Sequence, residues 1–517
     1  MPDAFLYDVV DYPPYVHQQM HPSRLAAIAR LHGVDASTPA ACHLLEVGCG
    51  DGLQLLTLAM AYPDSRFVGV DLSAKAIARG DAMRAKLGLD NLQLIAADLL
   101  DWNPGPEPFD YVLAHGFWSW VPEPVRHRLL EICRDTLAEN GLAYVSYNTL
   151  PGCHLRRMLW DILRFHSETA SSPEERVTRA LECIDLLDVG LGTKRKYAVT
   201  MHGEIEDLRK RFNPSVLFHD DLAEINDPCT LSDFLQQARA YGLEFMAEAN
   251  YQEMSLKIAA EDARPLLASL AENDLATKEQ YLDFLSGRRF RQSLLTRRQA
   301  APSPKADARV LTNLHAASEL KADPGANDPG GIRYVYKDNQ ITLDDPLLQH
   351  LLAICEANYP RHLLVATLVD NARGASASTR TRDEDLHTAT EFLLGAFEVG
   401  LVELSCDPPA FTTKAGEAPR ISPLARLQIE SGQVRITSLV PEMGKLESVM
   451  ARELALLLDG TRDRAALRRD LAARMAGIPT PQEDGTLACR TEVWWLAELP
   501  PLEAGLAELA HLGLLLD

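Results

Sequence analysis

The chain has 517 residues, of which 46% are hydrophobic and 24% charged, enough for roughly three or four domains with apolar cores. This composition excludes disorder over most of the length. The formal net charge of −22 argues against binding to nucleic acids or anionic membranes and favours a basic partner. No segment approaches the roughly 20 consecutive apolar residues of a membrane helix, and no secretion signal begins the chain. We therefore expect a cytoplasmic protein that is not inserted in a membrane.

The nine cysteines are spread singly, with no Cys-x-x-Cys pair and no His/Cys cluster at the spacing of zinc ligands. This distribution predicts reduced thiols and no bound metal.

After an amino-terminal arm (1–40), apolar strands alternate with helices. The pattern predicts strands over 43–47, 67–71, 92–96, 109–113 and 142–146, and helices over 53–61, 74–87 and 125–138. Asn140 and Gly141 are expected to cap the end of the third helix. The alternation predicts an α/β fold, a Rossmann-like doubly wound parallel sheet, in a core domain at 41–153.

The next segment, 154–240, has helical periods without strand patterns and is interpreted as a helical insertion. In the region 241–298, a strand at 243–247, a helix at 267–285 and an alternating strand at 289–295 are expected to complete the sheet. The stretch 299–334, rich in Pro and Gly, has the composition of a linker.

The remainder is mostly helical and repeats one order, three helices and a short strand, over 335–410 and again over 411–517. This order resembles two winged-helix modules. Winged helices often bind DNA, but the acidity of this chain favours protein contacts or a homodimer.

A glycine-rich turn lies directly between the first strand and the first helix and reads Glu46-Val47-Gly48-Cys49-Gly50-Asp51-Gly52. A dinucleotide fingerprint requires glycine at position 53, where this chain has Leu53, so the turn suits a ligand without a pyrophosphate. S-adenosylmethionine is such a ligand, because its amino-acid end can rest on the N–H groups at the helix N-terminus. The alternative is a turn that serves only tight packing.

Two acidic residues follow the next strands. Asp71 ends the second strand, 21 residues after Gly50, where a carboxylate can accept both ribose hydroxyls. Asp98 follows the third strand, where it can accept the adenine amino group while Leu99 packs on the ring. Each acid alone could be a helix cap or a turn residue. Glycines and acids at the carboxyl ends of successive parallel strands, however, indicate a ligand site.

The fourth and fifth strands open into loops that contain His115, Trp118 and Trp120, and Tyr147 and Asn148. Both loops are expected beside the sulfonium, where aromatic rings can exclude water and hold a cationic substrate. The alternatives are that either Trp packs against a helix and that His115 is structural.

Several further motifs occur together. They are Tyr7-Asp8, Tyr12 and His21-Pro22; Leu45-Glu46-Val47-Gly48-Cys49-Gly50; Phe67-Val68-Gly69-Val70-Asp71-Leu72-Ser73; His115-Gly116 with Ser119-Trp120-Val121-Pro122; Ser146-Tyr147-Asn148-Thr149, Pro151-Gly152 and His154; Phe218-His219-Asp220; and Tyr281-Leu282-Asp283-Phe284-Leu285 with Arg289-Phe290-Arg291. This set resembles the class I S-adenosylmethionine-dependent methyltransferases that carry a methyltransferase regulatory domain. That family includes rickettsial protein lysine methyltransferases acting on outer-membrane protein. Two departures are Gln54, where an Asn is usual, and Cys153, where a Trp is common.

The resemblance implies methyl transfer from S-adenosylmethionine, with lysine side chains of a lysine-rich protein as acceptors. It implies an acceptor side formed by His115, Trp120, Tyr147 and Asn148, and an arm that carries Tyr7, Tyr12 and His21 over the cofactor. The remaining cofactor-binding candidates are Glu46, Gly48, Cys49, Gly50, Gln54, Asp71, Leu72, Asp98, Leu99 and His115. Two alternatives stay open: a small-molecule O- or N-methyltransferase, and a non-catalytic S-adenosylmethionine-binding regulator. Since every cofactor motif precedes residue 150, the chain beyond about 335 is expected to be dispensable for cofactor binding.

Overall fold

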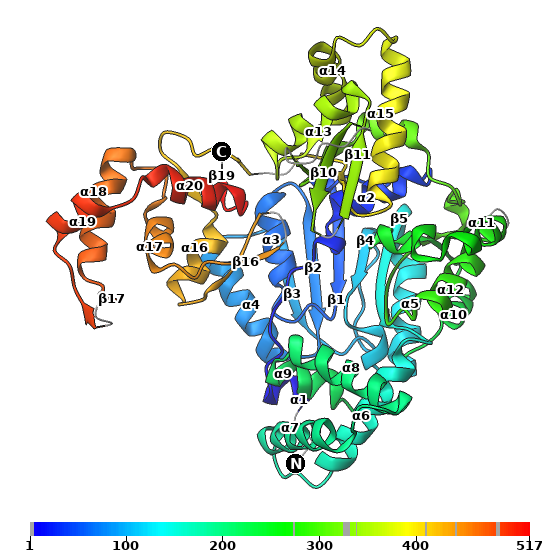
Figure 1. The fold of residues 1–517 in the computed structure, drawn as a ribbon. Coiled ribbons are helices and arrows are strands. Elements are labelled where there is room, and N and C mark those ends of the chain that lie inside the picture. The colour runs from blue at the N-terminus through cyan, green and yellow to red at the C-terminus, as the bar shows by residue number, and fades with distance from the viewer. Residues whose placement is uncertain are drawn as a thin grey trace.

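The structure is a computed structural model and describes residues 5–271, 274–323, 331–337, 339–408, 411–439, 442–481 and 486–516. A seven-stranded sheet in the order β3-β2-β1-β4-β5-β7-β6 lies at its centre (Figure 1). In chain order the strands are β1 (His43–Val47), β2 (Arg66–Asp71), β3 (Leu92–Ala96), β4 (Phe109–Ala114), β5 (Leu137–Asn148), β6 (Leu243–Glu248) and β7 (Phe290–Arg297). Strands β1 to β5 pair in parallel, whereas β7 is antiparallel to both β5 and β6. The predicted Rossmann-like sheet is confirmed, and the two later strands complete it.

Helices cover both faces of the sheet because side chains along each strand alternate between two apolar clusters. Leu44 of β1 belongs to the cluster formed with α2 (Pro22–Leu31), α3 (Leu53–Ala61) and α4 (Ala74–Leu87). Leu45 and Val47 belong to the opposite cluster, formed with α5 (Glu123–Thr136) and α10 (Leu231–Ala240). Because β1 to β5 run in parallel, the turns that lead from these strands into the following helices all lie at one end of the sheet.

The predicted end of the third core helix is wrong. Helix α5 ends at Thr136, and Asn140 and Gly141 lie inside β5. Leu137 is 2% exposed and packs under the sheet, and its carbonyl oxygen accepts Nε of Arg297 at 2.7 Å. Because of these contacts the chain joins the sheet at Leu137, before the Asn-Gly pair. Gly141 does not have the left-handed conformation of a helix cap.

A helical insertion follows β5. It contains α6 (Cys153–Ser167), α7 (Pro173–Gly190), α8 (Lys196–Lys210), α9 (Pro214–Val216) and a single π-helical turn, η4 (Leu217–Asp221). Its apolar side chains form a cluster of their own. With the short arm helix α1 (Leu6–Val9), it covers one end of the sheet (Figure 1).

The single helix predicted at 267–285 is two helices, α11 (Arg264–Ala271) and α12 (Leu275–Ser286). The Asp274 carboxylate accepts the N–H groups of Ala276 and Thr277 and so starts α12 as a new helix. Residues 272–273 lie outside the described ones.

The stretch 299–334, expected as a linker, carries regular structure. It contributes the 3₁₀ helix η9 (Ala308–Asn313) and strands β8 (His315–Ala317), β9 (Lys321–Ala322) and β10 (Ile332–Tyr336); residues 324–330 are outside the described part. Leu311, Leu314 and Ala316 are buried in the cluster that also contains α2 and α3. The prediction of a linker from the Pro- and Gly-rich composition is wrong here, because the buried side chains of Leu311, Leu314 and Ala316 fix the segment against the core.

The first C-terminal module shares that cluster. Its other elements are β11 (Asn339–Leu343), α13 (Pro346–Asn358), β12 (Leu363–Leu364), α14 (Val365–Ser376), α15 (Arg382–Phe397) and β13 (Glu403–Ser405). Strand β8 lies between β12 and β13. Ser23 of α2 accepts the N–H of Cys406 at 3.0 Å, and Gln18 donates to Glu403 at 2.8 Å. The module is thus packed directly on the core domain.

The second module has its own core. Its helices are α16 (Pro423–Glu430), α17 (Val449–Leu457), α18 (Arg464–Ala476), α19 (Glu492–Glu498) and α20 (Leu502–His511), and its short strands are β14 (Arg420–Ile421), β15 (Arg435–Thr437), β16 (Met443–Lys445), β17 (Thr480–Pro481), β18 (Leu487–Ala488) and β19 (Leu515–Leu516). Leu424 of α16 packs with Val16 of the arm and Leu53 of α3 in a small buried cluster. Within the described ranges, no helix has the length and apolar character needed to cross a membrane.

Candidate active site

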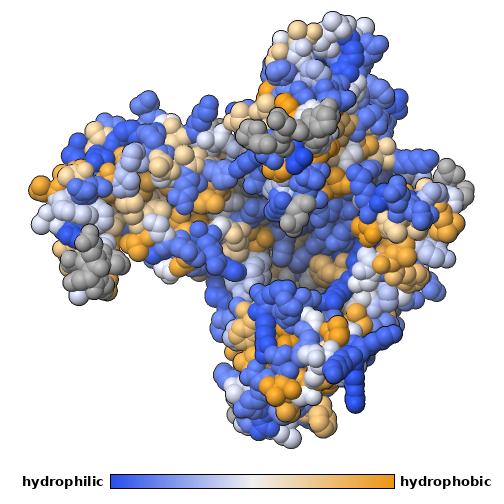
Figure 2. All heavy atoms as spheres, in the orientation of Figure 1, coloured by the Kyte–Doolittle hydropathy of each residue, from blue (hydrophilic) through white to orange (hydrophobic). Residues whose placement is uncertain are grey.

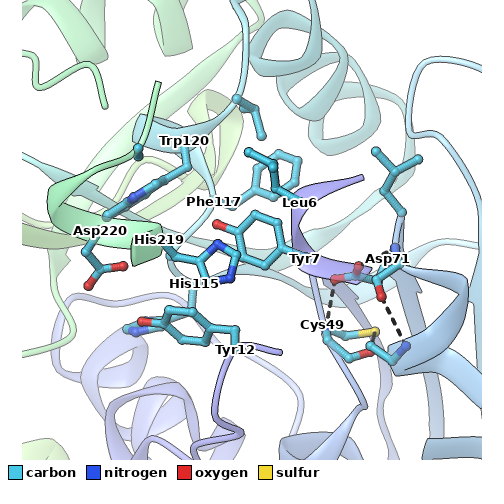
Figure 3. A pocket seen from close by; sticks show the side chains of 18 of the residues that line it. Leu6, Tyr7, Tyr12, Cys49, Asp71, His115, Phe117, Trp120, His219 and Asp220 are labelled. Carbon is cyan, nitrogen blue, oxygen red and sulfur yellow. Dashed lines mark hydrogen bonds between the residues drawn. The ribbon is translucent and has the colours of Figure 1, made fainter. Parts of the chain in front are cut away.

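A cavity of about 800 Å³ lies where the carboxyl ends of the parallel strands meet the helical insertion (Figure 3). The turns after β1, β2, β3 and β4 and the end of β5 line one side. Residues of the arm between positions 5 and 17 and of the insertion between 156 and 226, together with Arg289 and Phe290, line the rest. This is the sheet edge at which parallel α/β folds bind their ligands.

The glycine turn forms one end of the cavity. Gly48 and Gly50 have φ values of 73° and 57°, which glycine adopts without strain, and a Cβ at Gly48 would lie 2.8 Å from Phe117. The N–H groups of Gly50 and Ser73 each donate to one oxygen of Asp71 at 2.8 Å. Each oxygen keeps a lone pair, so Asp71 is fixed in place and can still accept two ligand hydroxyls.

Two buried polar atoms near the turn have no hydrogen-bond partner among the described residues. They are Oε2 of Glu46 and Nε2 of Gln54. Burial and the nearby carboxyls of Asp71 and Asp51 raise the pKa of Glu46 to about 8. Because an unpaired buried acceptor and donor are costly, this end of the cavity suits a ligand that carries an ammonium group and a carboxylate group.

The arm is held from two sides of the cavity. The Tyr7 ring stacks on His219 with ring centroids 4.1 Å apart, and Nε2 of His219 donates to the Val10 carbonyl oxygen at 2.7 Å. On the other side, the Ser73 hydroxyl donates to Asp8 at 2.5 Å. Since His219 belongs to the insertion and Ser73 caps α4, the arm connects the two walls of the cavity.

The end of the cavity opposite the glycine turn contains Trp120 and Asp220, as Figure 3 shows. Nε1 of Trp120 is buried without a hydrogen-bond partner among the described residues. Nδ2 of Asn148 donates to Asn226 at 2.8 Å, which leaves the Asn148 amide oxygen available as an acceptor. Burial raises the pKa of Asp220 to about 6. This end therefore offers aromatic, amide and carboxyl groups to an acceptor.

His115 lies among the lining residues and stacks against His17 of the arm, with ring centroids 3.9 Å apart. Its Nδ1 shares a hydrogen bond with the Tyr144 hydroxyl at 2.8 Å. Burial lowers the pKa of His17 to about 4 and that of His115 well below its ordinary value. Both rings are therefore neutral near pH 7 and do not repel a cationic substrate.

The cavity brings together most of the residues predicted for the site. Those that line it are Tyr7, Tyr12, Glu46, Gly48, Cys49, Gly50, Gln54, Asp71, Leu72, Asp98, Leu99, His115, Trp120 and Asn148. Leu99 is buried, whereas Asp98 is exposed and accepts the N–H of Leu100 at 2.9 Å. The role of each residue toward a ligand stays a prediction.

Two predicted site residues lie elsewhere. His21 starts α2, where its Nδ1 accepts the N–H of Ser23 at 3.2 Å. Tyr147 is fully buried in the core with its hydroxyl 3.1 Å from Ser293 Oγ. Neither lines the cavity. Successive side chains of a strand face opposite sides, so Asn148 reaches the cavity while Tyr147 reaches the core.

His17, His219 and Asp220 are among the lining residues that had no predicted role. The Phe218-His219-Asp220 motif was the only signal for the last two, because their helical context does not indicate that they reach the sheet edge. For Trp118 the alternative of packing against a helix is the correct one. Its side chain is fully buried and contacts Phe234 of α10 edge-on, with ring centroids 5.0 Å apart.

The sheet order, the glycine turn after β1 and the acids after β2 and β3 define a Rossmann-like methyltransferase. Family models match this chain to a methyltransferase domain (44–141), a predicted methyltransferase regulatory domain (213–297) and a PKMT C-terminal winged helix domain (417–488). The chain belongs to the class I S-adenosylmethionine-dependent methyltransferases that carry a methyltransferase regulatory domain. The predicted resemblance is confirmed, as is a C-terminal winged helix.

Two curated relatives and one solved structure are similar to this chain over different lengths. The uncharacterized protein RP789 of Rickettsia prowazekii is 33% identical over 290 residues, which cover 56% of this chain and 52% of that protein. RP028 of the same organism is 30% identical over 233 residues, 45% of this chain and 93% of that protein. This chain therefore spans about half the length of RP789 and nearly all of RP028. The structure of PKMT2 from Rickettsia typhi has a TM-score of 0.86 at 23% identity and covers 98% of this chain and 100% of its own. The fold is thus shared along nearly the whole chain.

The cofactor is S-adenosylmethionine, and the residues at the glycine turn fit it. The unpaired Glu46 Oε2 and Gln54 Nε2 suit the ammonium and carboxylate of its amino-acid part. The remaining lone pairs of Asp71 suit its ribose hydroxyls.

Proposed function

We propose that this protein transfers a methyl group from S-adenosylmethionine to the side-chain amine of lysine in a protein substrate. The observation that carries the proposal is the aromatic end of the cavity, where Trp120 and Tyr12 accompany Asp220 (Figure 3). Aromatic faces attract an ammonium group, and a partly dry environment favours its neutral amine. When bound, S-adenosylmethionine supplies the methyl group on a sulfonium.

The surface supports a macromolecular acceptor. The insertion that forms one wall of the cavity also exposes apolar side chains, with Phe165 80% and Val189 88% exposed. In Figure 2 apolar surface gathers over this insertion and over α11 and α12. Exposed apolar patches mark protein contacts more often than metabolite sites. The net charge of −22 would attract a lysine-rich substrate.

The test incubates the full chain with S-adenosylmethionine labelled in its methyl group and a lysate of the cells from which the gene comes. Mass spectrometry then locates the label. We expect mono-, di- or trimethyl-lysine in protein, and the Asp71→Ala variant, which should bind the cofactor weakly, is the matched control. Label found only on carboxylates, hydroxyls or small metabolites would overturn the proposal, and cofactor binding without any turnover would favour a regulatory role.

A further inference from the structure

Two consecutive carboxyl groups on the π-helical turn η4 have opposite environments. Asp221 is 2% exposed and fully engaged: Arg156, Arg211 and Trp160 donate to it at 3.0, 2.8 and 2.8 Å. Asp220 lines the cavity instead. Within the described residues it has no ion-pair partner. Consecutive side chains on a helical turn point in different directions, and π-helical turns are often found at functional sites.

The Tyr12 hydroxyl donates a hydrogen bond to Asp220, and the other groups that face it across the cavity include aromatic rings and Arg156, whose guanidinium is paired with Asp221. Burial and, after it, the negative charge of Asp220 raise the pKa values of Tyr7 and Tyr12 in the arm. Arg156 and Arg211 lower its pKa from a distance, but their guanidinium groups are bound to Asp221. Burial and the Asp221 carboxyl outweigh them, so the pKa of Asp220 rises to about 6. At neutral pH Asp220 is a carboxylate without a cation.

A buried carboxylate without an ion-pair partner among the described residues suits a ligand that carries a positive charge. On the side of the cavity away from Asp71, Figure 3 shows Asp220 beside Trp120 and Tyr12, with the Tyr7 and His219 rings between it and Asp71. Aromatic faces and a single carboxylate form a receptor for a primary ammonium group on a long apolar stem. A carboxylate substrate would be repelled, and a hydroxyl would leave the charge uncompensated.

We propose that Asp220 is a catalytic residue that binds the ammonium group of the acceptor lysine and takes a proton from it. This inference rests on the proposed function. In the step, one N–H bond of the ammonium breaks and an O–H bond forms on the Asp220 carboxylate, while the electron pair stays on nitrogen. The products are a neutral amine and a neutral carboxylic acid. Burial raises the pKa of a carboxyl group and lowers that of an ammonium group. The two pKa values therefore approach each other, which reduces the free energy needed for the proton transfer. The proton then returns to solvent.

The test compares two peptides and three proteins. A lysine peptide and the same peptide with norleucine differ only in the amine, and their affinities for each cofactor-saturated protein form a double-mutant cycle. The proteins are the wild type, Asp220→Asn and Glu206→Gln. Glu206 is the control, because it is a 67%-exposed carboxylate on the same insertion whose ion pair is with Lys210.

We expect the wild type and Glu206→Gln to prefer the lysine peptide at least about tenfold, and Asp220→Asn to bind both peptides equally. The Asn variant should lose about 10²- to 10⁴-fold in kcat/KM, the range for a general base, with cofactor affinity unchanged. In the wild type kcat/KM should rise through about pH 6 as Asp220 ionises, and the Asn variant should lack this limb. If Asp220→Asn keeps both the preference for the lysine peptide and the rise of kcat/KM through pH 6, the role of Asp220 is overturned while the proposed function stands. A wild type without lysine preference would overturn the proposed function, and this inference with it.

Discussion

Replacing Glu46 by Gln tests whether cofactor binding is coupled to loss of a proton. Glu46 is 6% exposed, faces the Asp71 and Asp51 carboxyls, and has a pKa raised to about 8. A positively charged ligand in the same cavity favours the ionised carboxylate and lowers this pKa. Binding should therefore expel the proton that Glu46 holds in the free protein.

The size of the effect follows from the pKa. A group with a pKa near 8 is about 90% protonated at pH 7, so each molecule of S-adenosylmethionine bound should release up to about 0.9 proton. The free energy of unfolding should also fall as pH rises from about 4.5 to 8. In this range Glu46 is ionised in the unfolded chain but still holds its proton in the folded one. The loss is at most about 5 kcal/mol and is absent from the Gln variant.

Titration calorimetry at pH 7 in two buffers with different ionisation heats measures the released proton directly. The wild type should show a buffer-dependent heat equivalent to most of one proton, and Glu46→Gln a much smaller one. Thermal unfolding between pH 5 and 9 should show that the unfolding temperature of the Gln variant increases relative to that of the wild type as pH rises. Equal proton release by both proteins, together with parallel unfolding curves, would refute the reasoning.

Four further substitutions probe the site and the arm. Asp71→Ala should weaken cofactor binding by about 1.5–3 kcal/mol, the scale of hydrogen bonds to a charged group; unchanged affinity in calorimetry would remove Asp71 from the ribose site. Tyr147→Phe should cost about 1 kcal/mol in thermal unfolding and leave kcat within about twofold, since it loses only the Ser293 contact, whereas Trp120→Ala should depress kcat at unchanged cofactor affinity. The reverse pattern would return Tyr147 to the acceptor channel. Leu424→Ala should destabilise the protein by about 2–4 kcal/mol and increase cleavage of the arm by added protease; an arm as resistant as in the wild type would show that Leu424 does not hold it.

The cofactor half of the site could be predicted because its geometry is local. Strand, glycine turn and helix follow within a few residues, and strand alternation then fixes which end Asp71 and Asp98 reach. The same alternation explains the error at Tyr147, since Ala143, Val145 and Tyr147 share the face buried against α5 and α10. Aromatic character alone does not reveal that face.

The acceptor half could not be predicted in the same way because tertiary packing assembles it. Asp220 lies on the π-helical turn η4 and reaches the cavity through the packing of the insertion, which a helical period in the sequence does not reveal. His17 reaches His115 from a distant arm segment without regular periodicity. His21 was misplaced for the complementary reason, since its position before Pro22 makes it a helix cap.

The arm packs against the second C-terminal module as well as against the walls of the cavity. A single turn such as α1 is too short to be stable alone, so the arm takes its position from its neighbours. Those neighbours are Ser73 in the core, His219 in the insertion and Leu424 in the winged helix, which packs on Val16 directly before His17. Leu53 belongs to the same cluster and also lines the cavity. This packing argues against the expectation that the chain beyond 335 is dispensable for cofactor binding. If a ligand of the winged helix alters this packing and so changes cofactor affinity, the cofactor must change the affinity of that ligand by the same factor.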